Sequence, residues 1–191
     1  MYLYFSYIMT ASNSGYSNIS ILHLTEPNQL ELAYHVRREV YVVEQGYLPN
    51  VVIDEYVFYS LFQNNNWCAL NRDDPDAEHW AAIADKHNED GSIEPNHSIG
   101  TIRLVRISKN VARLGRVAVL SNARGLGIGP KLIKEFTEYC KSNGYHTIYL
   151  HAVTEKRGFY EKLGFAVEDG DHEEFEEDGT PHIRLWKRNI M

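Results

Sequence analysis

The sequence predicts an α/β fold of the α+β kind, and two stretches lead to this class. In residues 113–130 a short apolar segment with β-branched valines, typical of a buried strand, leads into a glycine-rich loop and an amphipathic helix. Near the C-terminus, Asp178-Gly179 lies between Phe175 and the apolar residues 183–186, which indicates a β-hairpin. We therefore expect a mixed sheet whose last two strands are antiparallel.

Length and composition fit one domain. The chain has 191 residues, of which 43% are hydrophobic and 24% are charged, as is ordinary for a globular protein with a substantial core. The net charge of −7 argues against the backbone of a nucleic acid as partner, because that would favour a basic surface. Two cysteines, Cys68 and Cys140, cannot build a disulfide framework, so a cytoplasmic protein is expected.

The first part of the chain is expected to supply one strand and one helix. Residues 1–18 are interpreted as a flexible N-terminal extension, since the apolar start is far shorter than the roughly 20 residues of a membrane span. Residues 19–191 would form the single domain. Alternating apolar residues predict a strand over 19–24, followed by Thr25 as a cap and by a helix over 28–43.

The next stretch is expected to hold two further strands. Residues 56–78 are interpreted as an elaboration, because their runs of Asn and Asp with Pro are loop signals. Strands are predicted over 78–84 and 98–107, with residues 87–97 as a long polar loop between them.

The glycine-rich loop predicts an anion site. Gly125, Gly127 and Gly129 alternate, which keeps side chains off the backbone and permits positive φ. The N–H groups of the loop, and of a helix that Pro130 begins, can then face one anionic ligand, and Arg124 adds a cation. We interpret the loop as a pyrophosphate site, whose spacing matches neither a P-loop nor the dinucleotide-binding glycine fingerprint.

The segments after the loop continue the same pattern. A helix is predicted over 131–143 and ends at Gly144, a typical residue after a helix C-terminus. A strand is predicted over 147–153. The apolar face of the helix is formed by Leu132, Ile133, Phe136, Tyr139 and Cys140, so Cys140 is expected to be a buried free thiol. The acidic residues 168–178 are interpreted as a solvated hairpin face.

Several motifs together resemble one family. The spacing Arg124-x-x-Gly127-x-Gly129 resembles the acetyl-CoA loop of the GNAT acetyltransferase superfamily, and residues 157–165 resemble its Phe-Tyr-x-x-x-Gly-Phe box. Residues 36–45 and 173–183 look like the ElaA-like branch of that superfamily. The resemblance covers roughly residue 19 to the C-terminus. It implies a mostly antiparallel central sheet of six to seven strands, with a splay between strands four and five, flanked by helices.

The resemblance also implies an activity and its co-substrate. It implies an N-acetyltransferase that moves an acetyl group from acetyl-CoA to a primary amine of a small molecule by direct transfer in a ternary complex. Residues expected to bind acetyl-CoA are Val117, Ala118, Val119, Arg124, Gly125, Leu126, Gly127, Ile128, Gly129, Pro130, Thr154 and Phe159. Backbone groups of Val117 and Val119 would hold the pantetheine arm as an added strand does. Because proline lacks an N–H, Pro130 leaves the phosphate-binding loop with one backbone hydrogen-bond donor fewer. Two alternatives stay open: acetylation of a protein or peptide amine, and an acyl-CoA sensor of the same fold without catalysis.

The resemblance suggests catalytic residues less completely. Tyr160 of the Phe-Tyr box is the expected general acid, since a phenol of pKa about 10 can protonate a leaving thiolate. Glu44, at the end of the first predicted helix, is the second catalytic candidate. The acceptor side is expected to use Tyr41, Glu44, Asp54, Glu55, His79, His151 and His182, whose carboxylates would attract an ammonium group. The general base is not assigned.

The remaining expectations concern partners. No His/Cys cluster has zinc spacing, so no metal is expected. The partner is expected to be a small-molecule amine rather than a nucleic acid or a membrane. The protein is expected to be a monomer or a homodimer.

Overall fold

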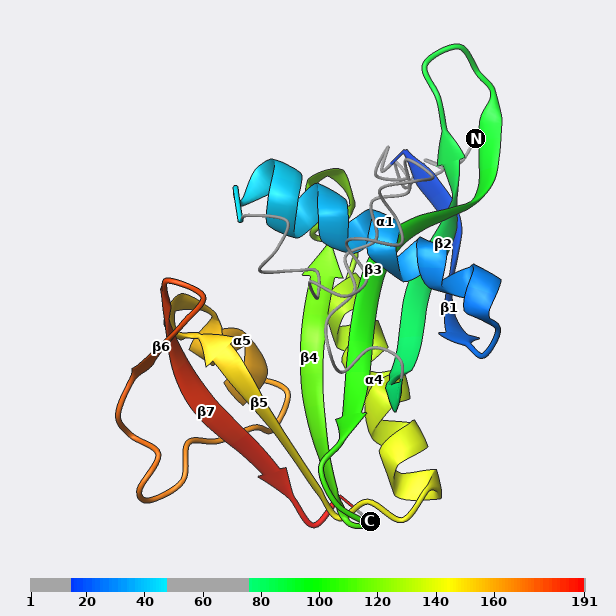
Figure 1. The fold of residues 1–191 in the computed structure, drawn as a ribbon. Coiled ribbons are helices and arrows are strands. Elements are labelled where there is room, and N and C mark those ends of the chain that lie inside the picture. The colour runs from blue at the N-terminus through cyan, green and yellow to red at the C-terminus, as the bar shows by residue number, and fades with distance from the viewer. Residues whose placement is uncertain (1–14, 48–75, 191) are drawn as a thin grey trace, which may run out of the picture.

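Seven strands form one sheet in the computed structural model, which describes residues 15–47 and 76–190 (Figure 1). Across the sheet the strands follow the order β1 (Tyr16–Leu24), β2 (Glu78–His87), β3 (Ile93–Arg106), β4 (Val111–Val119), β5 (Thr147–Val153), β7 (Thr180–Arg188) and β6 (Phe175–Glu177). Neighbouring strands are antiparallel except β4 and β5, which are parallel. The predicted fold class is therefore confirmed. Asp54, Glu55 and nearly all of the predicted elaboration over 56–78 lie outside the described residues.

The parallel contact between β4 and β5 is short. In the described residues it joins Val111 to Thr147, Ala112 to Ile148 and Arg113 to Tyr149. Beyond Arg113 the strands separate, and Figure 1 shows β5 and β7 leaning away from β4. This is the predicted splay, and it leaves the second half of β4 open on the side of β5.

Helices cover both faces of the sheet. Helix α1 (Leu30–Arg37) lies over one face and α4 (Ile128–Ser142) over the other, while the short α5 (Arg157–Glu161) follows β5 (Figure 1). The predicted helix over 28–43 is confirmed in extent. It begins as a 3₁₀ turn. The N-terminal cap is a capping box formed by Glu26 and Gln29, and not the predicted Thr25. It then widens into a π-helix over Arg38–Glu44, a form that is frequent at functional sites.

Helix α4 packs as its sequence predicts. Its buried residues include Leu132, Ile133, Phe136 and Cys140, and Cys140 is a free thiol. The helix ends in a Schellman motif, in which Tyr145 N–H donates to the Cys140 carbonyl at 3.0 Å and Gly144 has φ +78°. It begins at Ile128, two residues before the predicted start, so Pro130 is its third residue rather than its first. At that position the missing N–H is still one that no helical carbonyl would accept.

Two predicted boundaries were wrong. Residues 87–97 are not a long loop, because β2 continues to His87 and β3 begins at Ile93, with Lys86 paired to Glu94. This hairpin has a polar sequence since residues 91–96 are exposed. Strand β1 begins at Tyr16 and pairs there with Lys86, so residues 16–18 belong to the sheet and not to an extension.

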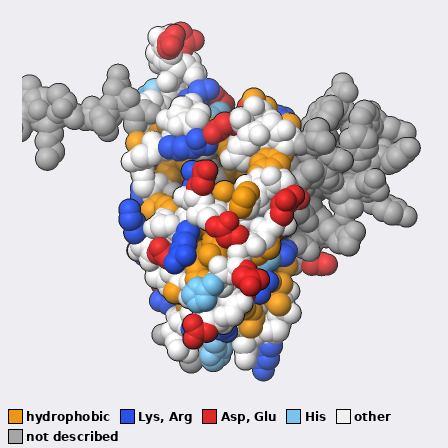
Figure 2. Space-filling model, turned by 90° about the vertical axis from the view of Figure 1, so that its left-hand side faces the viewer, with side chains coloured by type: hydrophobic (Ala, Val, Ile, Leu, Met, Phe, Trp, Pro, Cys, Tyr) orange, Lys and Arg blue, Asp and Glu red, His pale blue; other side chains and the backbone are white. Residues whose placement is uncertain are grey.

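The C-terminal hairpin is confirmed. Asp178 has φ +53° and Gly179 has φ +74°, the two positive angles that a type I′ turn needs. No residue of the acidic stretch 168–178 is buried. Figure 2 views the molecule from the side of β6 and β7 and shows acidic and basic side chains interspersed. Two ion pairs connect this stretch to β7, since Glu168 pairs with Arg188 at 2.6 Å and Asp171 with Arg184 at 3.1 Å.

In the described part of the chain, none of the helices has the length and apolar character that crossing a membrane requires.

Candidate active site

A cavity of about 1050 Å³ lies where β4 and β5 separate. Its walls come from the end of the first helix, β3, β4, the glycine loop, the start of α4, α5 and the C-terminal hairpin. Ligand pockets commonly measure about 300–1,000 Å³, so this cavity has the volume of a large ligand pocket. The predicted site residues that line it are Tyr41, Glu44, Val117, Ala118, Val119, Arg124, Gly125, Gly127, Ile128, Gly129, Pro130, His151, Phe159, Tyr160 and His182.

The glycine loop leaves open space at one end of the cavity. Gly125 and Gly127 have φ of +84° and +73°, and a Cβ at either would meet nothing within 4 Å. Gly127 caps α4, so the first N–H groups of a 15-residue helix face this space. At Gly129 a Cβ would come within 3.1 Å of the Phe159 ring, so this glycine lets α5 approach α4. Backbone donors, a helix N-terminus and room for a ligand together suit phosphate groups.

Arg124 is bound to Glu44 across this end of the cavity. Its Nη1 and Nη2 donate to the two carboxylate oxygens at 2.7 and 2.6 Å, and its Nε donates to the Val119 carbonyl at 3.1 Å. The hydrogen bonds from Arg124 hold the pKa of Glu44 below its usual range. A carboxylate with a lowered pKa is a poor proton acceptor, so this placement argues against Glu44 as a general base. Glu44 still lines the cavity, and its role in binding the acceptor stays a prediction.

Substitution Glu44→Gln is expected to strengthen acetyl-CoA binding by up to about 5-fold, the effect of the ~1 kcal/mol that an exposed ion pair is worth. The variant frees Arg124 for an incoming phosphate and removes a negative charge beside it. Calorimetric titration at low and moderate salt measures the change. Glu161→Gln is the matched control, because Glu161 pairs with Arg157 at 2.7 Å away from the cavity lining. Weaker binding in Glu44→Gln would mean that Glu44 holds Arg124 in its binding position.

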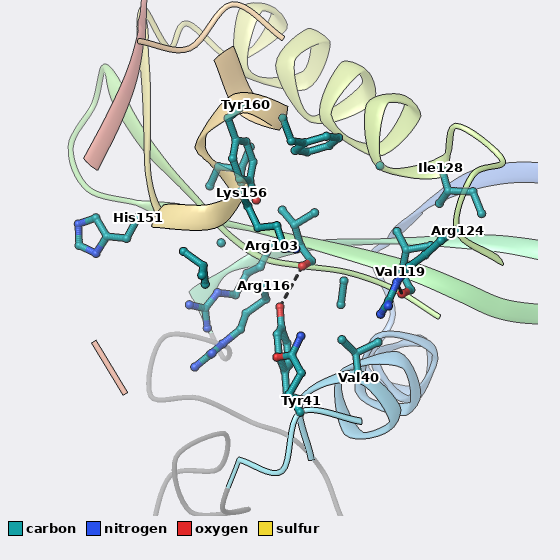
Figure 3. A pocket seen from close by; sticks show the side chains of 18 of the residues that line it. Val40, Tyr41, Arg103, Arg116, Val119, Arg124, Ile128, His151, Lys156 and Tyr160 are labelled. Atoms are coloured by element: carbon teal, nitrogen blue, oxygen red, sulfur yellow. Dashed lines mark hydrogen bonds between the residues drawn. The ribbon is translucent and has the colours of Figure 1, made fainter. Parts of the chain in front are cut away.

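Tyr160 enters the cavity from α5, opposite Tyr41 (Figure 3). Its ring makes edge contacts with Phe159 and Phe165, with centroids 5.0 and 6.1 Å apart. Burial is the main cause that raises the pKa of Tyr160 well above its usual value, and the neighbouring Tyr41 adds to the increase. The phenol therefore keeps its proton throughout the neutral range, as a proton donor must.

The carbonyls of Val117 and Val119, whose backbone groups were predicted to hold the pantetheine arm, already accept hydrogen bonds. Tyr41 donates its hydroxyl to the Val117 carbonyl at 3.1 Å, and Arg124 donates to that of Val119 at 3.1 Å. A carbonyl oxygen has two lone pairs, so each can accept a second bond. Tyr41 thus joins the first helix to β4 and is not a free hydroxyl at the acceptor side.

The three predicted histidines lie in different surroundings. Nδ1 of His151 donates to the Glu177 carboxylate at 2.6 Å, and its Nε2 accepts from Arg184 at 3.5 Å. Nδ1 of His182 lies 2.8 Å from the Thr180 carbonyl, which can only accept, so Nδ1 carries the hydrogen and Nε2 of the neutral ring has a lone pair. His182 is therefore the cavity histidine best suited to accept a proton.

Some predicted residues do not line the cavity. His79 is 1% exposed and its Nδ1 accepts a 2.8 Å hydrogen bond from Arg37, so its prediction as an acceptor-site residue was wrong. Leu126 packs against the core. Thr154 begins the turn between β5 and α5, with its hydroxyl buried. Neither residue lies among the cavity walls.

Sequence reasoning missed several charged and polar residues of the walls. They are Arg103, Arg113, Arg116, Tyr47, Lys156, Glu177 and Asp178. The available signal was the occurrence of arginines within two neighbouring predicted strands, at 103, 113 and 116, close to the predicted splay. Tyr47 also connects the first helix to β7, since its hydroxyl lies 2.7 Å from that of Thr180. Within the described residues, His, Cys, Asp and Glu side chains form no group of three that could hold a metal ion.

Comparisons with known proteins agree with this arrangement. The model of the Acetyltransferase (GNAT) family matches residues 37–165. A Bacillus subtilis relative that bears the name of an acetyltransferase is 28% identical over 171 residues, which are 90% of this chain and 97% of the relative. A solved structure from Lactobacillus plantarum, which bears the name of an N-acetyltransferase, is similar with a TM-score of 0.67 and 25% identity, over 91% of this chain and 99% of that one. ElaA of Escherichia coli has the same fold, with a TM-score of 0.61 and 23% identity over 91% and 99% of the two chains.

Proposed function

Since the chain belongs to the acetyltransferase (GNAT) family, we propose that it transfers an acetyl group directly from acetyl-CoA to a primary amine of a small molecule while both are bound. Membership of this family indicates acetyl transfer as the activity and acetyl-CoA as the co-substrate. The observation that supports direct transfer is the single continuous cavity, with the glycine loop at one end and Tyr160 and His182 farther along. No metal or covalent acyl-enzyme is part of this proposal.

The end of the cavity at the glycine loop would hold the phosphate groups of acetyl-CoA. Backbone N–H groups of residues 125–129 and the Arg124 guanidinium would donate hydrogen bonds to them, and the open space above Gly125 and Gly127 fits such groups. Bound acetyl-CoA supplies the acetyl group in an activated thioester. Val117 and Val119 would orient the arm that carries it, through backbone groups along the open edge of β4.

Two side chains would handle the protons. As the C–N bond forms and the C–S bond breaks, the amine must lose a proton and the leaving sulfur must gain one. We assign the first proton to Nε2 of His182, directly or through water, because an imidazole is a better acceptor than a carboxylate of pKa about 4. The second proton comes from the Tyr160 hydroxyl, which its raised pKa keeps protonated.

Thiol release from acetyl-CoA against a panel of amines tests the proposal. The panel contains amino acids, amino sugars, polyamines and basic peptides, and mass spectrometry identifies the N-acetyl product. We expect turnover of a class of small amines, with the intersecting initial-rate pattern of a ternary complex rather than ping-pong kinetics. Preference for peptides would favour the peptide alternative. Acetyl-CoA binding without any acetylated product would favour the sensor.

A further inference from the structure

Arginines gather at the end of the cavity that is remote from the glycine loop. In Figure 3, Arg103 and Arg116 both lie in the part of the cavity between Tyr41 and His151, with Arg124 on the opposite side. Their separation from Arg124 matters. A cation near the glycine loop can be explained by the phosphates of acetyl-CoA, whereas a cation at the far end cannot.

Arg103 and Arg113 are positioned by strand geometry. Arg103 pairs with Gly115 across β3 and β4, and a Cβ at Gly115 would lie 3.7 Å from its guanidinium. The guanidinium therefore lies against the glycine, and Arg103 is 3% exposed. Arg113 comes two residues before Gly115 and so shares its face of β4.

Arg116 is positioned by an irregularity of β4. The β3–β4 register shifts between Thr101 and Arg103, and Arg116 there has φ +52°. A long side chain rarely adopts this left-handed conformation, and such strain collects at functional sites. A bulge of this kind re-aims a side chain. Here the guanidinium lies 5.8 Å from the centre of the Tyr41 ring.

The charge of the walls is opposite to that of the chain. The described lining residues include five Arg or Lys and three Asp or Glu, although the whole chain has a net charge of −7. Two of the three acidic side chains have near partners, since Glu44 binds Arg124 and Glu177 binds His151. Burial raises the pKa of Tyr41, and the charges of Arg116, of Arg37 behind the wall and of Arg103 oppose that increase. A concentrated positive field in a cavity attracts anions and repels polyamines.

We infer that the acceptor amine carries an oxyanion, a carboxylate or a phosphate, which Arg116 binds together with Arg103. This inference rests on the proposed function, since it names the substrate class of the same cavity. The planar guanidinium fork fits both kinds of oxyanion in a bidentate manner. It replaces the expectation, drawn from Glu44, Asp54 and Glu55, that carboxylates attract an ammonium group.

Matched pairs of amines test the inference. The carboxylate arm compares L-amino acids and β-alanine with their carboxamides, the phosphate arm compares O-phosphoethanolamine with ethanolamine, and putrescine represents dications. We expect the anionic member of at least one arm to have a kcat/KM about 10-fold or more above its neutral partner, as hydrogen bonds to a charged group allow. The arm that shows this preference identifies the oxyanion.

Variants of Arg116 then assign the effect to a residue. Arg116→Gln should raise KM for the anionic amine about 10-fold, leave the neutral partner within about 2-fold, and leave KM for acetyl-CoA unchanged. Arg116→Lys should recover part of the loss. Arg157→Gln is the matched control, because Arg157 is exposed, pairs with Glu161 and does not line the cavity. Thermal unfolding confirms that each variant is folded.

The outcomes separate this inference from the proposed function. Faster turnover of carboxamides or putrescine, or an equal loss for both members of a pair in Arg116→Gln, would overturn the inference and leave acetyl transfer intact. If no amine is acetylated, the proposed function fails, and calorimetric titration of the same amines onto the protein saturated with CoA decides the inference. Anion binding that Arg116→Gln weakens supports it, and absence of anion binding overturns it.

Discussion

Replacing Tyr160 by phenylalanine is expected to lower kcat by roughly 10- to 10⁴-fold with little change in KM for acetyl-CoA. The substitution keeps the ring, and thus its edge contacts with Phe159 and Phe165, and removes only the hydroxyl. Because burial raises the pKa of Tyr160, the wild-type phenol stays protonated as the pH increases through neutrality. Its rate should therefore show no alkaline decline from this group below about pH 10, the ordinary tyrosine pKa.

Steady-state rates of the wild type and of Tyr160→Phe measure this effect. A pH range of about 6 to 10 roughly covers the titration of histidine and of amines. Tyr149→Phe is the control, since Tyr149 lies on the neighbouring strand β5 and does not line the cavity. A wild-type kcat in Tyr160→Phe would leave Tyr160 with a packing role alone. Positioning of the two substrates, which can supply about 7 kcal/mol or more, would then explain most of the catalysis.

Gly127→Val is expected to weaken acetyl-CoA binding by about 100-fold or more, equivalent to ~2.7 kcal/mol, while the protein still folds. A Cβ at Gly127 meets no protein atom within 4 Å, so the valine side chain would instead occupy the space of the phosphate groups. Its φ of +73° strains a β-branched residue, so stability should fall by about 1–3 kcal/mol. Calorimetric titration and thermal unfolding measure the two effects separately.

Gly144→Val provides a matched control for the strain. Gly144 follows the other end of α4 with φ +78°, and a Cβ there also meets nothing within 4 Å. Both variants should lose similar stability, but only Gly127→Val should lose affinity. Unchanged affinity in folded Gly127→Val would remove the assignment of this loop to phosphate.

The parts of the fold that could be predicted are those that local sequence determines. The loop at Gly127, the Schellman end at Gly144 and the turn at Asp178-Gly179 each depend on backbone angles that few residues allow. The hairpin of β2 and β3 was missed for the opposite reason. Its strands project with exposed residues 91–96, so no apolar alternation marks them.

The candidate site was less predictable, because its interactions join distant segments. Glu44 and Arg124 are separated by 80 positions, and nothing near Glu44 in the sequence indicates its partner. His79 and His182 are equally plausible as acceptor residues in the sequence, yet one is sealed in the core beside Arg37 and the other lines the cavity. The direction in which a strand residue points depends on register, and the shift in β4 at Arg116 has no local signature.

The left-handed backbone conformation of Arg116 also lowers the stability of the protein at a position whose side chain faces the cavity. A glycine at this position would adopt φ +52° without the cost of about 1–3 kcal/mol that strain at a non-glycine residue carries. Selection for thermal robustness alone would thus favour Arg116→Gly, and the same change would remove the guanidinium from the cavity. An arginine at such a position is a stability cost that a recognition role would justify, and efforts to stabilise this protein should leave residue 116 unchanged.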